Sequence, residues 1–213
     1  MAFNFPEGSS QQFSQTFASA KTITAVSNAN PAVLTSVSHG YTTGDEVLFT
    51  SGWEDATNTV YKINVLTADT FSVLGLNSVN TNFYPVGAGV GTTQKISGWT
   101  AIPQVITIDT SGGGPRFTDV QLLSSRNAIK VPTGFEATTT TLSLAHDATL
   151  AGYVTMLDIS RSLTKVAFKQ VLGSGAITYG YGYLATSESP KLNANNVNTV
   201  HSVTAPLGRA ISY

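Results

Sequence analysis

Short stretches of alternating apolar and polar residues, separated by turn residues, dominate this chain and predict a mainly β protein. In the first part of the chain these stretches predict strands over residues 9–18, 21–26, 32–36, 46–50, 61–66 and 71–75. Further strands are expected over residues 102–109, 120–123, 127–131, 138–145, 197–204 and 209–213. Residues 110–115 are expected to form a loop that is mobile in isolation or is ordered by a partner, because three consecutive glycines are costly to order.

One helix is predicted over residues 149–162. Asp147 is a residue type that caps helix N-termini. Five positions at helical spacing form one face that should pack onto a sheet: Leu150, Tyr153, Val154, Leu157 and Arg161.

A hairpin is predicted over residues 165–186, with the turn Gly-Ser-Gly between its strands. Its second strand places Tyr179, Tyr181 and Tyr183 on one face and leaves Gly180 and Gly182 on the other. Such an aromatic strip needs a cover, which is either the core of the same chain or a neighbouring subunit.

A block of short strands over residues 20–94 interrupts the pattern and ends in Gly87-Ala-Gly-Val-Gly91. This organisation predicts a small β module, residues 20–94, inserted into a host domain made of residues 1–19 and 95–213.

Only 11% of the residues are charged and the net charge is −1, so no basic field exists to hold nucleic acid. A surface poor in Lys and Glu fits a protein that packs against copies of itself, and it fits an ordinary Thr-rich β protein equally well. The absence of cysteine excludes disulfides and thiolate metal sites. Neither a signal-peptide pattern nor a membrane span occurs, so synthesis in the cytoplasm of the producing cell and no membrane partner are expected.

No catalytic, cofactor-binding or metal-binding residues are predicted. His39, His146 and His201 have no partners at metal-ligand spacing, and no nucleophile elbow occurs. The acidic pairs Asp45-Glu46 and Glu54-Asp55 are interpreted as solvated turns. The aromatic residues Trp53, Tyr61 and Tyr84 either fill the core of the small module or form a glycan-stacking platform.

The order of these elements resembles a known family. Residues 127–134 (NAIKVPTG), TTTTLSLAHD, the helix, KVAFKQVL, ITYGYGYLATSE and the closing NNVNTVHSVTAPLGRAISY look like the major tail tube protein of long-tailed, non-contractile bacteriophages. The opening MAFNFPEGSSQQFSQTFA is similar as well. The inserted block, with NANPAVLTSVSHGYTTGDEVLF, resembles a small module of phage virion proteins called FCCH-like.

This resemblance implies a β-sandwich or split barrel with one flanking helix and no enzymatic activity. It implies a virion tail protein, made in the host cytoplasm, whose hexameric rings stack into a hollow tube. The tube would enclose the tape-measure protein, meet the tail terminator and distal tail proteins, and let DNA pass without specific binding. The alternative is a β-rich module that binds glycans or a host surface.

On this basis we expect subunit or ring contacts at three places. The first is the glycine-rich loop, with Gly112, Gly113, Gly114, Pro115, Arg116 and Phe117, for which a simple surface turn is the equal alternative. The second is the aromatic strand, with Tyr179, Gly180, Tyr181, Gly182 and Tyr183. The third is formed by the two chain ends, residues 2–8 and 210–213, the latter including Ile211 and Tyr213. Gly180→Val or Gly182→Val is expected to disturb ring formation more than the solubility of the monomer.

Overall fold

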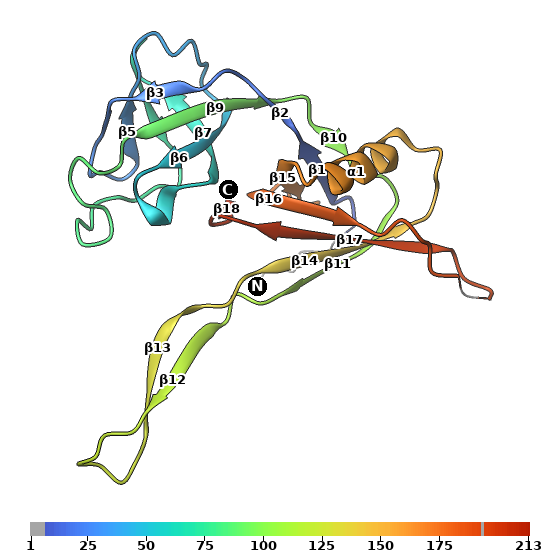
Figure 1. The fold of residues 1–213 in the computed structure, drawn as a ribbon. Helices are drawn as coiled ribbons and strands as arrows, with labels where there is room; N and C mark the ends of the chain where they lie inside the picture. The colour runs from blue at the N-terminus through green and yellow to red at the C-terminus, as the bar shows by residue number, and fades with distance from the viewer. Residues whose placement is uncertain (1–6, 193) are drawn as a thin grey trace.

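The computed structural model describes residues 7–192 and 194–213. It is mainly β with one α-helix, which confirms the predicted fold class. Figure 1 shows two bodies side by side, each built on an antiparallel sheet, and a long hairpin that projects from one of them.

The main sheet has eight antiparallel strands and does not close into a barrel. Its order is β10-β1-β15-β16-β17-β14-β11, with β18 paired to β16. The strands are β1 (Ser10–Ser14), β10 (Thr100–Ala101), β11 (Val105–Ser111), β14 (Thr139–Ala145), β15 (Lys165–Val171), β16 (Ile177–Thr186), β17 (Thr199–Pro206) and β18 (Ile211–Ser212). The pairing of β15 with β16 confirms the predicted hairpin over residues 165–186.

Helix α1 (Ala151–Ser162) packs on the main sheet through Tyr153, Met156 and Ile159, which are buried. One expectation about this helix, its N-cap, was wrong, and a second, its buried face, holds only in part. Its N-cap is Leu150, and the Asp147 carboxylate instead accepts hydrogen bonds from the backbone and hydroxyl of Thr149 before the helix begins.

The buried face of α1 differs in part from the predicted one. Val154 is 45% exposed and Arg161 points outward to pair with Glu188 at 2.8 Å. Leu150, Tyr153 and Leu157 pack on the core as predicted. Met156 and Ile159, at i+3 and i+6 from Tyr153, join them in place of Val154 and Arg161.

A second antiparallel sheet forms the body that we call the module. Its order is β2-β9-β6-β7-β8-β5-β4, with β3 paired to β9. The elements are β2 (Thr16–Phe17), β3 (Lys21–Ile23), β4 (Ala25–Val26), β5 (Ala32–Thr35), β6 (Glu46–Ser51), the short 3-10 helix η1 (Glu54–Ala56), β7 (Thr59–Val65), β8 (Thr70–Val73) and β9 (Gly91–Ser97). The division into residues 20–94 and the rest remains a proposal, and its second boundary falls within β9.

The core of the module is aromatic. Trp53 and Tyr61 are each 1% exposed, and Tyr84 packs edge-to-face on Trp53. Stacking on a sugar needs an open aromatic face, and Trp53 and Tyr61 have none. These side chains therefore build the module, and they offer no glycan platform.

The projecting hairpin, which we call the arm, consists of β12 (Pro115–Val120), β13 (Ile129–Phe135) and the tip between them. Within the part of the chain that the structure describes, the two strands pair only with each other, and every residue of β12 is exposed. The predicted loop over residues 110–115 is shorter than expected, because only Gly112–Gly114 lie outside the strands. The prediction of a strand over residues 120–123 was wrong. Thr110 and Ser111 end β11, and residues 121–123 lie in the tip of the arm.

Candidate assembly surfaces

The aromatic strand β16 finds its cover within the chain at Tyr179. This side chain is 1% exposed and packs with Leu48, Val60 and Ile96 of the module. Tyr181 is half-buried and meets Phe17 edge-to-face at 5.8 Å between ring centroids. Tyr183 lies beyond the module and is 39% exposed. Of the three tyrosines, Tyr183 is thus the one open to a neighbouring molecule.

A buried carboxylate fixes the module to the main sheet. Glu46 Oε1 accepts hydrogen bonds from Lys169 Nζ, at 2.7 Å, and from the hydroxyl of Tyr179. Its Oε2 accepts from the indole N–H of Trp99. The side chains of Lys169 and Glu46 are only 18% and 12% exposed. The interpretation of Glu46 as part of a solvated turn was therefore wrong, because the residue lies on β6 at the junction between the two bodies.

The environment keeps the Tyr179 hydroxyl protonated. Burial raises its pKa above the ordinary value, and the hydrogen bond to the negatively charged Glu46 raises it further. A protonated hydroxyl can only satisfy the carboxylate as a donor. Glu46 thus has three donors around its two oxygens, which is the arrangement a buried carboxylate requires.

The C-terminal strand also docks within the chain. Ile211 packs against the core of the module. The hydroxyl of Tyr213 donates to the carbonyl oxygen of Leu74 at 2.7 Å and accepts from the N–H of Lys62 at 3.0 Å. Together with Tyr179, these contacts make the C-terminus part of the junction. Of the other proposed end, residues 2–8, only Glu7 and Gly8 are among the described residues.

The two glycines of β16 differ in the space around them. A Cβ on Gly182 would lie 2.1 Å from the carbonyl oxygen of Ala205 and 2.7 Å from the Cα of Pro206. Both are backbone atoms of β17, so they cannot rotate away from the added Cβ as a side chain could. A Cβ on Gly180 would meet nothing closer than Phe168, at 3.8 Å.

We therefore expect Gly182→Ala to destabilise the monomer by about 3 kcal/mol, the upper end of the usual cost of overpacking. Gly180→Ala is the matched control and should change the free energy of unfolding by less than about 1 kcal/mol. Urea unfolding of the two variants measures both values. Equal stabilities would show that β17 moves away freely and that Gly182 is not needed for the monomer fold.

The root of the arm is an ordered, hydrogen-bonded segment. Gly113 N–H donates to the carbonyl of Glu136, and Glu136 N–H donates to the carbonyl of Gly114 at 2.8 Å. Gly112 has a φ of +82°, and a Cβ there would lie 2.0 Å from the Ala137 oxygen, so this position requires glycine. The glycine-rich segment thus joins the main sheet to the arm, with Arg116 and Phe117 exposed on β12.

Both ends of the main sheet are open. Among the described residues, strand β11 pairs only with β14, and its outer edge carries no strand. At the other end, β10 pairs with only two residues of β1. Open edges present unpaired N–H and C=O groups that can pair with another chain.

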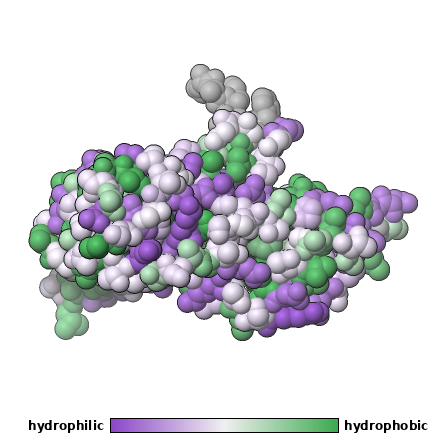
Figure 2. Space-filling view, turned by 90° about the horizontal axis from the view of Figure 1, so that it is seen from above, coloured by the Kyte–Doolittle hydropathy of each residue, from purple (hydrophilic) through white to green (hydrophobic). Residues whose placement is uncertain are grey.

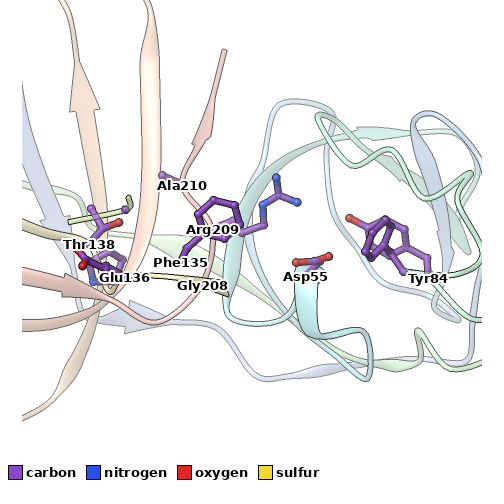
Figure 3. A pocket seen from close by; sticks show the side chains of 11 residues that line it. Asp55, Tyr84, Phe135, Glu136, Thr138, Gly208, Arg209 and Ala210 are labelled. Atoms are coloured by element: carbon purple, nitrogen blue, oxygen red, sulfur yellow. The ribbon is translucent and has the colours of Figure 1, made fainter. Parts of the chain in front are cut away.

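A groove of about 660 Å³ lies between the module and the root of the arm (Figure 3). Its walls come from five stretches of the chain and include Asp55, Phe83, Tyr84, Phe135, Glu136 and Arg209. In Figure 3, Asp55 and Tyr84 of the module lie on one side, and Phe135 and Glu136 of the arm's root lie on the other. Elsewhere, the face seen in Figure 2 mixes apolar and hydrophilic residues without one large apolar patch.

The described residues contain no cluster of three His, Cys, Asp or Glu side chains that could hold a metal ion. Within the same part of the chain, no helix is both long and apolar enough to cross a membrane.

A family model described as phage tail tube protein matches residues 51–212, which is most of the chain. No curated protein matches. The matched residues include the arm, its glycine-rich root, α1 and the strands β11 to β18.

Proposed function

The chain belongs to the phage tail tube protein family, and from this premise we propose that its subunits form hexameric rings that stack into the hollow tail of a long-tailed, non-contractile phage. Membership of the family makes it a structural protein of the virion tail that assembles with copies of itself. The ring, its symmetry and its cargo are the proposal.

The observation that carries this proposal is the pair of open edges on the main sheet. If β11 of one subunit pairs with the β10 and β1 edge of the next, the sheet continues from subunit to subunit. A ring closes this arrangement and leaves no free edge, which removes the aggregation hazard of an isolated sheet.

The arm is proposed to make contacts between neighbouring subunits or stacked rings. A two-stranded hairpin is marginally stable in water by itself. This one nevertheless exposes large apolar side chains, among them Phe117 at 54% and Phe135 at 74%. Packing against another subunit would cover them, and the glycine-rich root, Gly112 to Gly114, would set the direction of the arm.

The bore of the tube is proposed to enclose the tape-measure protein and later to conduct DNA, and its ends are proposed to meet the tail terminator and distal tail proteins. Passage of DNA requires a wall that does not hold phosphate. The net charge of −1 supports this, since no excess of Lys and Arg is present to line the bore.

Electron microscopy of the purified full chain tests this proposal. We expect rings or tubes of uniform diameter that increase with protein concentration. Ile106→Lys, on the exposed face of the edge strand β11, is expected to reduce assembly without unfolding the monomer, because Ile106 is 53% exposed. A chain that stays strictly monomeric at high concentration would contradict the proposal.

A further inference from the structure

We infer that the groove between the module and the root of the arm is the socket for the tip of the arm of a second copy of this chain. The module would then have a defined role in assembly, since it supplies one wall of the socket. This inference rests on the proposed function and adds to it the partner segment and the receiving site.

The tip of the arm, residues 121–128, has the composition of a buried contact rather than of a solvated loop. Leu123 is fully exposed and Leu122 is 49% exposed. The tip contains no acidic residue and one basic residue, Arg126, which forms no ion pair within the described part of the chain. Two neighbouring leucines beside a free cation predict a partner surface that is both apolar and acidic.

The groove offers such a surface. Phe83 from the module is 64% exposed and Phe135 from the arm's root is 74% exposed, so both rings are available for contact. The carboxylates of Asp55 and Glu136 line the same groove, and neither forms an ion pair among the described residues.

The charges of the two surfaces are complementary. Arg209 also lines the groove, so two carboxylates and one guanidinium leave it with a net negative charge. The arm, residues 115–135, contains Arg116, Arg126 and Lys130 against the single acid Asp119, and is the more basic surface. The volume of about 660 Å³ lies within the range of about 300–1,000 Å³ that ligand pockets occupy.

The geometry requires that the tip come from another copy. Phe135 and Glu136 stand at the root of the arm, while the tip lies beyond six residues of β12, a reach of about 20 Å at 3.3–3.4 Å per residue. Figure 1 shows the arm directed away from the body that forms the groove. When the tip of one copy occupies the socket of the next, the pair still has one free tip and one free socket. The contact is therefore head-to-tail, and further copies can add to either end.

Cross-linking between two variants tests this inference. The natural sequence has no cysteine, so the reagent can react only with the cysteines that are introduced. Leu123→Cys marks the tip, Phe83→Cys marks the socket, and Leu163→Cys, 71% exposed at the end of α1, is the control. Full-length variants are mixed in pairs, assembled, and treated with a short bis-maleimide. We expect covalent dimers from the mixture of Leu123→Cys with Phe83→Cys, and none from either variant alone or from Leu123→Cys with Leu163→Cys.

A charge exchange gives a second measurement. Arg126→Glu is expected to raise the concentration needed for assembly by at least about tenfold, because it places like charges together. Combining it with Asp55→Lys and Glu136→Lys should restore assembly. Two results would overturn the inference and leave the proposed function intact. The first is tubes that form without the tip–socket cross-link, and the second is an Arg126→Glu variant that assembles as wild type does. A wild-type chain that forms no assemblies at all would overturn both.

Discussion

A chain in which an Asn-Gly turn replaces residues 115–135 is expected to fold into a stable subunit and to form no tubes. Among the residues that the structure describes, the arm contributes nothing to the buried clusters, its strands pair only with each other, and every residue of β12 is exposed. The same exposed residues are the ones proposed to hold subunits together. Removing them should therefore separate folding from assembly.

The root of the arm permits this replacement. Glu136 N–H donates to the carbonyl of Gly114, so these two residues already face each other across the hairpin. A two-residue Asn-Gly loop suits such a pair because both of its positions accept a positive φ. The thermal midpoint of the shortened chain should stay within a few degrees of wild type, a change of less than about 1 kcal/mol in stability. Sedimentation and electron microscopy should find only free subunits or single rings.

Thr118→Ser, an exposed position on β12, serves as the matched control and should assemble as wild type does. If the shortened chain formed tubes at the same concentration as the control, the arm would have no part in assembly. A shortened chain that failed to fold would show that the arm stabilises the subunit, contrary to its exposure.

The contrast between the hairpin β15–β16 and the arm shows which strands the sequence could predict. Strands β15 and β16 face a core on at least one side, so apolar residues alternate along them and the turn is marked by glycine. The arm has no buried side, so buried and exposed positions do not alternate along its strands. The apolar run Leu122-Leu123 was therefore interpreted as a strand although it lies at the tip.

The first strand shows a second limit. Residues 9–18 alternate as one strand, but β1 pairs in the main sheet with β15 and β2 pairs in the module with β9. The chain passes from one sheet to the other at Gln15 without a glycine or proline to mark the change. Partner strands distant in sequence decide this break, and a local pattern contains no information about them.

The junction was missed for the same reason. Glu46 lies 53 residues from Trp99, 123 from Lys169 and 133 from Tyr179 along the chain. As a charged residue next to Asp45, it matched the composition of an exposed turn. The prediction of an aromatic strip on β16 was the one available signal, because a buried tyrosine hydroxyl requires a hydrogen-bonding partner.

Glu46→Ala is expected to lower the free energy of unfolding by about 3–5 kcal/mol, the usual cost of removing one partner from a buried ion pair. The substitution leaves Lys169, 18% exposed in its side chain, without its counter-charge. It also leaves the Tyr179 hydroxyl and the Trp99 indole N–H without their acceptor. Because these groups join the two bodies, urea unfolding should split into separate transitions for the module and the main sheet.

A double-mutant cycle identifies the cause. Lys169→Met combined with Glu46→Ala should cost less than the sum of the two single changes by about 2 kcal/mol, because no unpaired charge remains buried. Glu54→Ala, an exposed carboxylate on η1 of the same module, should change stability by less than about 0.5 kcal/mol. A Glu46→Ala variant as stable as Glu54→Ala would mean that apolar packing around Tyr179 alone holds the module in place. The buried carboxylate would then not be the group that couples the two sheets.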